Sequence, residues 1–148
     1  MALLFTIDAS VFVAACQRSE PGHIASRALL EAMIHVDVPL IEPAILPVEV
    51  AAALRRTGHD VALSLEFAES IFALSYLTLQ PVDERLARRA AALATQCRLR
   101  GADALYVTVA AQYGARLVTL DAEQLERAPA TLGACKPEAA TRLLLPLG

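Results

Sequence analysis

Several residue patterns on which common functions depend are missing from this sequence. Its six glycines form neither a GxGxxG fingerprint nor a P-loop, so the phosphate-binding loops of nucleotide-binding folds are not expected. Its three cysteines and three histidines are widely spaced and include no CxxC pair, which argues against a zinc site and favours reduced thiols. Lys136 is the single lysine among thirteen basic residues, so positive charge is carried by arginine, which binds phosphate with two parallel hydrogen bonds.

Long apolar runs are also missing, although 56% of the residues are hydrophobic and the mean hydropathy is +0.48. The longest candidate, residues 104–115, is shorter than the ~18 residues of a membrane span and contains Thr108, Gln112 and Gly114. No basic segment precedes the N-terminal apolar residues, and Asp8 interrupts them, so they do not form a signal peptide. We therefore expect one cytoplasmic domain over residues 1–148, without membrane contact. The net charge of −3 by itself argues weakly against a nucleic-acid partner.

Short apolar runs alternate with amphipathic segments along the chain. Strands are expected at residues 3–7, 38–41, 76–79 and 116–120, with a weaker edge strand at 142–145. Helices are expected at residues 10–15, 23–35, 47–56, 59–74, 83–97 (closed by Gly101), 103–113 and after Asp121. Strands that alternate with helices are joined by right-handed crossovers, which predicts an α/β fold with a mainly parallel sheet covered on both faces.

Four acidic residues stand at positions where such a sheet would build a site. Asp8 and Asp121 each follow an expected strand directly, and ligands of open α/β sheets bind beyond the carboxyl ends of the strands. Glu49 lies near the start of an expected helix, and its neighbours three and four positions away are apolar or small, so no helical ion pair explains it. Asp103 opens the helix expected at 103–113.

Three of these acids also have an ordinary structural explanation. Asp8 could cap the helix expected at 10–15, and Asp121 fits a capping box with the glutamine three residues later. Asp103 near a helix start is favourable for the helix dipole, whatever its function. Asp83 is equally suited to capping a helix and has no place among the four acids, so it serves as a comparison.

The segments around the four acids resemble the motifs of the PIN-domain ribonucleases, in particular the toxin half of bacterial VapBC toxin–antitoxin pairs. The similarity covers nearly the whole chain in the family's order, and residues 99–121 are its most specific part. All four family acids are present, whereas the chain after Pro129 departs most from the family pattern. The motifs are DAS at 8–10, VEVAAALRR at 48–56, LRGADALY at 99–106 and LVTLD at 117–121.

The resemblance implies a three-layer α/β/α fold with strand order 3-2-1-4-5. It also implies a catalytic centre in which four carboxylates hold one or two Mg²⁺ or Mn²⁺ ions for the hydrolysis of RNA phosphodiester bonds. Ser10 and Thr119 would then not bind the metal themselves but orient the carboxylates that do. The catalytic and metal-binding residues implied in this way are Asp8, Glu49, Asp103 and Asp121.

The resemblance further implies the toxin of a type II toxin–antitoxin system, which forms a homodimer and binds a small antitoxin protein. The residues give independent support for a partner. Leu65 and Phe72 lie outside the main apolar face of the helix expected at 59–74, which predicts an exposed apolar patch of the kind found at partner surfaces.

Two other functions remain open at this point. A catalytically silent PIN-like module would bind RNA or a partner protein without cutting RNA, and four intact acids argue against it. A haloacid-dehalogenase-like phosphatase would use Asp8 as its nucleophile. That class usually has a second acid where this chain has Ser10, and it needs a lysine later in the chain, for which Lys136 is the only candidate.

Overall fold

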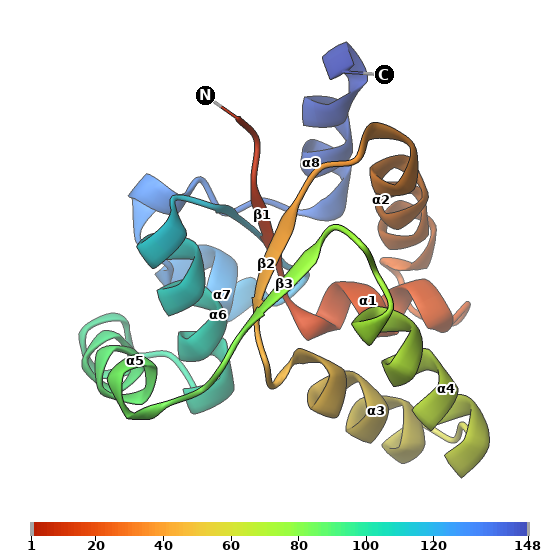
Figure 1. The fold of residues 1–148 in the computed structure, drawn as a ribbon, viewed down its shortest axis with the longest axis horizontal. Coiled ribbons are helices and arrows are strands. Elements are labelled where there is room, and N and C mark those ends of the chain that lie inside the picture. Colours follow the sequence, from red (N-terminus) through yellow and green to blue (C-terminus); the bar gives the residue numbers. More distant parts are fainter. Residues whose placement is uncertain (1, 148) are drawn as a thin grey trace.

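Within residues 2–147, which a computed structural model describes, four short parallel strands form the centre of the protein. They are β1 (Phe5–Ile7), β2 (Leu40–Pro43), β3 (Leu77–Gln80) and β4 (Arg116–Val118), in the order β3-β2-β1-β4. All neighbouring pairs are parallel, and Phe5 is paired with Leu40 on one side and with Arg116 on the other. Figure 1 shows this sheet with β3 at its edge. The α/β class and the order of the first four strands agree with the prediction.

Helices cover both sides of the sheet, as expected for three layers. On one side, α6 packs against β1, β2 and β4, and α5 lies beside α6 (Figure 1). On the other side, α1 contacts α2 and α3, while α3 contacts α4 and α2 contacts α8. The helices are α1 (Ala9–Cys16), α2 (His23–Val36), α3 (Leu46–Arg56), α4 (Val61–Phe72), α5 (Glu84–Cys97), α6 (Gly101–Tyr113), α7 (Ala122–Arg127) and α8 (Pro137–Leu144). Among residues 2–147, no helix is both long and apolar enough to cross a membrane.

The strands form where they do because both faces of the sheet are covered. Every residue of β1 and β2 is buried, so these segments are continuous apolar runs rather than alternating ones. The prediction placed β2 two residues too early, because Glu42 looked like the end of a strand. Glu42 is instead a fully buried residue of β2, and its Oε2 accepts a hydrogen bond of 2.7 Å from the backbone N–H of Ile7. At the carboxyl end of β1, the side chain of Glu42 therefore accepts the backbone hydrogen bond that a neighbouring strand would otherwise accept.

The expected strand at residues 142–145 is wrong. These residues belong to the end of α8 and to the 3₁₀ turn η2 (Leu145–Leu147). Pro137 starts α8 in the position that proline tolerates best, and Ala140 and Leu144 are buried on the face toward α2. The place beyond β4 is taken by Cys135, which makes an isolated parallel bridge to Val118. In the described part of the chain the sheet therefore has four strands, not five.

The junction between α5 and α6 also differs from the prediction. Helix α5 ends at Cys97 because Arg98 adopts the left-handed conformation, with φ of 58°. Gly101, which was expected to close α5, is the first residue of α6. Asp103 consequently lies inside the first turn of α6, directed toward the same edge of the sheet as Asp8 and Asp121.

Candidate active site

A cavity of about 520 Å³ opens beyond the carboxyl ends of β1 and β4, and all four acids line it. Each acid comes from a different part of the fold: Asp8 from the end of β1, Glu49 from the first turn of α3, Asp103 from α6, and Asp121 from the start of α7. The other residues that line the cavity are Ala9, Ser10, Val13, Ala14, Glu20, Ala53, Arg56, Arg100, Ala102 and Leu120.

Asp8 is both a helix cap and a buried acid of the cavity. Its Oδ2 accepts the backbone N–H of Ser10 at 3.1 Å, which caps α1, and the hydroxyl of Thr119 at 3.3 Å. Its Oδ1 has no hydrogen-bond partner among residues 2–147. Burial raises the pKa of Asp8, although the hydrogen bonds from Ser10 and Thr119 oppose this effect; the charge of Asp121 raises the pKa further. The capping role and a role in the cavity are therefore compatible.

Asp121 divides its two oxygens in a similar way. Its Oδ1 accepts the backbone N–H of Gln124 at 2.9 Å and caps α7, while Oδ2 accepts a hydrogen bond of 2.8 Å from Arg100. Only half of the predicted capping box forms. The side-chain amide of Gln124 donates to the backbone oxygen of Asp103 at 3.3 Å, and the N–H of Asp121 donates to Thr119 Oγ1 at 3.0 Å.

The two hydroxyls expected to orient the carboxylates connect the ends of β1 and β4. Thr119 is fully buried and contacts both Asp8 and Asp121 through Oγ1. Ser10 Oγ accepts the N–H of Leu120 at 3.1 Å and lies 3.5 Å from Thr119 Oγ1. These contacts fix the positions of Asp8 and Asp121 relative to each other.

Glu49 reaches the cavity from α3 and is held by a buried tyrosine. Its Oε1 accepts a hydrogen bond of 2.7 Å from the hydroxyl of Tyr106, which is fully buried on α6. Burial raises the pKa of Glu49, the hydrogen bond from Tyr106 lowers it, the charge of Asp8 raises it, and Arg56 lowers it again. The absence of a helical ion pair, noted from the sequence, is explained because the partner of Glu49 belongs to another helix.

Asp103 has the most unusual environment of the four acids. Burial and the charges of Asp8 and Asp121 raise its pKa to about 6, although Arg100 acts in the opposite direction. Its Oδ2 is buried and accepts no hydrogen bond from the described residues. The nearest cation to that oxygen is Arg100, whose Nε lies 3.4 Å away. Asp103 is thus partly buried, and its buried Oδ2 lies near a cation without accepting a hydrogen bond.

The four acids line one cavity, but their side chains do not converge on a single metal position. Among residues 2–147, no three acidic, histidine or cysteine side chains converge closely enough to hold a metal ion as they stand. Asp121 Oδ2 is paired with Arg100, and Glu49 Oε1 is paired with Tyr106. The donor set nevertheless fits a hard divalent cation, because it consists of carboxylate oxygens and includes Asp103 Oδ2, which is buried and accepts no hydrogen bond from the described residues.

Two other residues singled out from the sequence, Asp83 and Lys136, lie outside this cavity. Asp83 caps α5 through a 2.9 Å hydrogen bond from the N–H of Leu86 and does not line the cavity. Lys136, which a phosphatase of the haloacid-dehalogenase type would need beside Asp8, lines a neighbouring cavity of about 370 Å³ and not the one that contains Asp8. The structure therefore gives no support to the phosphatase alternative.

Two residues whose side chains donate hydrogen bonds to two of the four acids were not singled out from the sequence. Arg100 lies three positions before Asp103, and Tyr106 lies three positions after it. This spacing places both residues near Asp103, but it does not indicate that their hydrogen bonds go to Asp121 and Glu49. Glu42 carried no comparable signal, because nothing in its local sequence distinguishes a buried glutamate from one that ends a strand.

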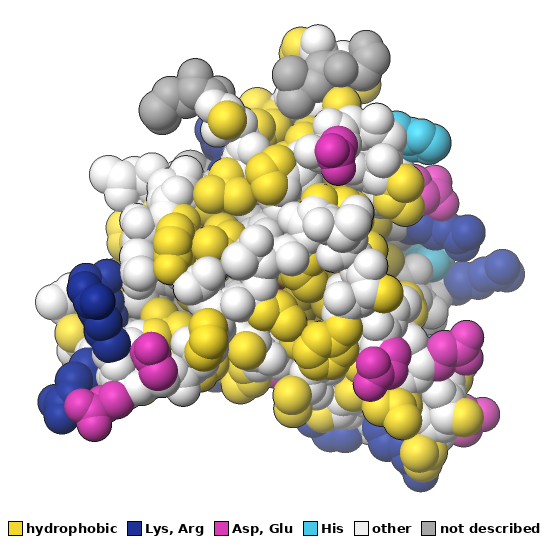
Figure 2. Space-filling view, in the orientation of Figure 1, with side chains coloured by type: hydrophobic (Ala, Val, Ile, Leu, Met, Phe, Trp, Pro, Cys, Tyr) yellow, Lys and Arg dark blue, Asp and Glu magenta, His cyan; other side chains and the backbone are white. Residues whose placement is uncertain are grey.

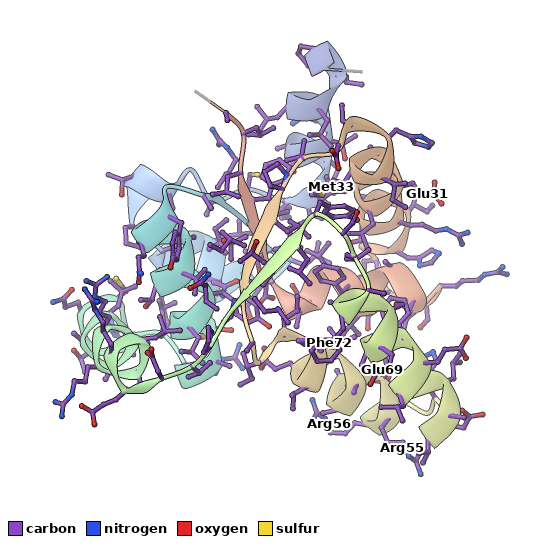
Figure 3. All side chains as sticks on the ribbon, in the orientation of Figure 1. Glu31, Met33, Arg55, Arg56, Glu69 and Phe72 are labelled. Atoms are coloured by element: carbon purple, nitrogen blue, oxygen red, sulfur yellow. The ribbon has the colours of Figure 1, made fainter. Side chains whose placement is uncertain are left out.

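A second surface feature lies between α3 and α4. The predicted exposure of Leu65 and Phe72 is confirmed, with 56% and 53% of their surfaces accessible. Both line a groove of about 530 Å³ whose other walls include Val48 and Val61. Figure 2 shows hydrophobic side chains gathered over this region, and Figure 3 shows Glu69 and Phe72 on α4 opposite α3.

Comparisons with known proteins agree with this architecture. The family model of the PIN domain matches residues 5–130. The solved structure of the protein PAE2754 from Pyrobaculum aerophilum is similar, with a TM-score of 0.70, 22% identity, and coverage of 98% of this chain and 90% of that one. Among curated protein sequences, none matches with significance.

Two further solved structures share the fold. VapC20 from Mycobacterium tuberculosis, a toxin that cleaves the sarcin-ricin loop, gives a TM-score of 0.63 at 15% identity over 78% of this chain and 86% of that one. VapBC2 from Rickettsia felis, bound to a DNA fragment from its promoter, gives a TM-score of 0.65 at 16% identity over 90% of this chain and 98% of that one. At these identities the likeness establishes the fold alone.

Proposed function

The chain belongs to the PIN domain family, and we propose that it is a metal-dependent endoribonuclease that hydrolyses RNA phosphodiester bonds. The observation that carries this proposal is the arrival of four carboxylates, from four separate elements, in one cavity at the carboxyl edge of the sheet. Helix capping accounts for Asp8 and Asp121, but it does not account for Glu49 or for the buried, unpartnered oxygen of Asp103.

Asp8, Glu49, Asp103 and Asp121 would hold Mg²⁺ or Mn²⁺ in this cavity. A bound divalent ion of this kind supplies a water of lowered pKa and neutralises charge on the leaving oxygen of a phosphodiester. The remaining work is done by the protein. Thr119 keeps Asp8 and Asp121 at a fixed separation, and Tyr106 directs Glu49 into the cavity.

The substrate would be bound by arginine at the rim of the cavity. Arg56 and Arg100 both line it, and a guanidinium group can donate two parallel hydrogen bonds to one phosphate. A phosphate backbone bound by these two arginines would lie beside the four acids. We propose RNA as the substrate because the motifs around the acids resemble those of ribonucleases.

We also propose that the protein is the toxin of a type II toxin–antitoxin system, acts in the cytoplasm, and forms a homodimer that binds a small antitoxin protein. The support is twofold. The apolar groove between α3 and α4 is a surface suited to a protein partner. Two similar structures carry the names VapC20, a toxin, and VapBC2, and both span most of this chain.

Cleavage of RNA by the purified protein tests the proposal. We expect cleavage in Mg²⁺ or Mn²⁺, loss of cleavage in EDTA, and recovery when the metal is restored. Asp8→Asn should reduce the rate by at least about a hundredfold, since a carboxylate ligand and its charge are lost. Asp83→Asn is the matched control and should cleave like the parent. Equal cleavage by Asp8→Asn and the parent would contradict the proposal. RNA binding without cleavage in Mn²⁺ would indicate a binding module instead.

A further inference from the structure

Arg100 connects two of the acids that are proposed to hold metal. Its Nη2 lies 2.8 Å from Asp121 Oδ2, and its Nε lies 3.4 Å from Asp103 Oδ2. A third, more distant carboxylate is Glu123, 4.0 Å away, which also pairs with Arg127 at 3.6 Å. The guanidinium group therefore places a positive charge between the two carboxylates from α6 and α7.

We propose that Arg100 is an exchangeable counterion of the site: it neutralises Asp103 and Asp121 while no metal is bound, and it gives up both carboxylates when a divalent cation binds. The released guanidinium group then binds a phosphate of the RNA backbone. This inference rests on the proposed metal-dependent function and adds a role for Arg100 in setting metal affinity and in holding the substrate.

Competition for the same oxygen atoms supports the exchange. Asp121 Oδ1 is occupied by the helix cap, so Oδ2 is the oxygen that can serve a metal, and Arg100 holds it. Asp103 Oδ2 accepts no hydrogen bond from the described residues, and Arg100 is its nearest cation. A metal ion that binds these two oxygens would therefore compete with the positive charge of Arg100.

The surroundings of Arg100 allow it to move. Its side chain is 69% exposed, and exposed ion pairs contribute little to stability, so breaking them has a small cost. Arg100 precedes the first residue of α6, has an extended backbone and makes no side-chain capping hydrogen bond to the helix.

The same side chain is suited to the phosphate that would replace the carboxylates. It lines the cavity together with Arg56, which comes from the end of α3. A planar guanidinium group matches phosphate with two parallel hydrogen bonds, in the way that it matches a carboxylate. Arg100 can therefore pair with the two carboxylates before metal binds and with a phosphate of the substrate afterwards.

Calorimetric titration of Mn²⁺ into the RNA-free protein tests the first half of the proposal. Arg100→Gln should bind Mn²⁺ about two- to fivefold more tightly than the parent, the change expected when an exposed competing ion pair is removed. The matched control is Arg88→Gln, which breaks a comparable exposed pair of 3.0 Å with Glu84, far from the site, and should not change Mn²⁺ affinity. In addition, Arg100→Gln should melt below the parent without metal, and saturating Mn²⁺ should reduce that difference.

Cleavage kinetics at saturating Mn²⁺ test the second half. Arg100→Gln should raise KM severalfold with a smaller change in kcat, and Arg100→Lys should recover only part of the loss. Unchanged or weaker Mn²⁺ binding by Arg100→Gln would overturn the counterion role, and an unchanged KM would overturn the phosphate role. If the parent and the variant bind Mn²⁺ equally, only this inference fails. If neither binds Mn²⁺, the metal-dependent function fails with it.

Discussion

The hydroxyl of Thr119 donates a hydrogen bond of 3.3 Å to the carboxylate of Asp8, and it joins residues 111 positions apart in the sequence. The same oxygen accepts the backbone N–H of Asp121 at 3.0 Å. One buried hydroxyl thus connects the two acids that end β1 and follow β4. These two hydrogen bonds hold the end of β1 beside the segment that follows β4.

Thr119→Val tests the contribution of this hydroxyl, because valine removes the hydroxyl and keeps the packing of the side chain. The variant keeps the shape of the residue, but it removes one of the two hydrogen bonds to Asp8 Oδ2 and leaves the N–H of Asp121 without its acceptor. We expect a loss of about 1–3 kcal/mol in the free energy of unfolding, and weaker Mn²⁺ binding. Urea denaturation and Mn²⁺ titration measure the two effects. Thr108→Val, which removes a buried hydroxyl bonded to Ala104 and distant from the acids, should affect stability alone.

Tyr106→Phe removes the hydrogen bond to Glu49 and little else. Since that hydrogen bond lowers the pKa of Glu49, its loss should raise the pKa further and weaken metal binding. We expect a fall of about 1 kcal/mol in stability and a severalfold fall in kcat for RNA cleavage. Tyr113→Phe is the control, because it removes a similar 2.8 Å bond to Gln80 outside the cavity. Equal kcat values for parent and Tyr106→Phe would show that Tyr106 does not position Glu49.

Glu42→Gln should stabilise the protein at neutral and alkaline pH. Glu42 is fully buried, and burial raises its pKa well above the usual range. A raised folded-state pKa means that the folded protein binds more protons than the unfolded chain. The stability supplied by protonated Glu42 is therefore present below the unfolded pKa of about 4.3 and is lost as pH rises through the folded pKa.

Glutamine resembles the protonated acid and can still accept the N–H of Ile7, so Glu42→Gln should gain stability relative to the parent between about pH 5 and pH 8. Urea denaturation at pH 4, 6 and 8 measures the gain, which should be smallest at pH 4. Exposed Glu126→Gln should give no such trend. A Glu42→Gln variant that is less stable at every pH would show that the charged form is the one the fold requires.

Metal binding should depend on pH through Asp103, whose pKa is raised to about 6. A carboxylate must lose its proton before it binds metal, so Mn²⁺ affinity should fall as pH drops below about 6, by up to about tenfold per pH unit. Calorimetry at pH 6 in buffers of different ionisation enthalpy should detect proton release on binding. The release should be smaller in Asp103→Asn. Mn²⁺ affinity that is constant from pH 5 to pH 7 would remove Asp103 from the metal site.

Much of the fold could be predicted from the sequence because buried parallel strands and capped helices leave local signals. The four strands, the helices between them and the caps at Asp8, Asp83 and Asp121 follow from apolar runs and from short polar residues at helix starts. The C-terminal segment was harder, since residues 142–145 are apolar enough for a strand. Only packing of Ala140 and Leu144 toward α2 decides for a helix.

The candidate site was predictable in its acids but not in their partners. Asp8 and Asp121 follow strands, and the gathering of strand ends at one edge is a property of parallel sheets. Tyr106 and Arg100 act on acids that lie far away in the sequence or on a neighbouring element, so their contacts depend on how the layers pack. The state of each carboxylate oxygen, such as the unpartnered Oδ2 of Asp103, is a tertiary property that no local pattern reports.

The central claim is that the four acids form one metal site, and thermal melting at pH 7 with and without millimolar Mn²⁺ tests it most directly. Metal that binds only the folded state stabilises it by mass action, so Mn²⁺ should raise the Tm of the parent and of Asp83→Asn equally. Asp8→Asn should melt above the parent without metal, because a buried, repelled carboxylate is replaced by a neutral cap, and it should gain much less from Mn²⁺. A parent Tm that does not change in millimolar Mn²⁺ would contradict the account.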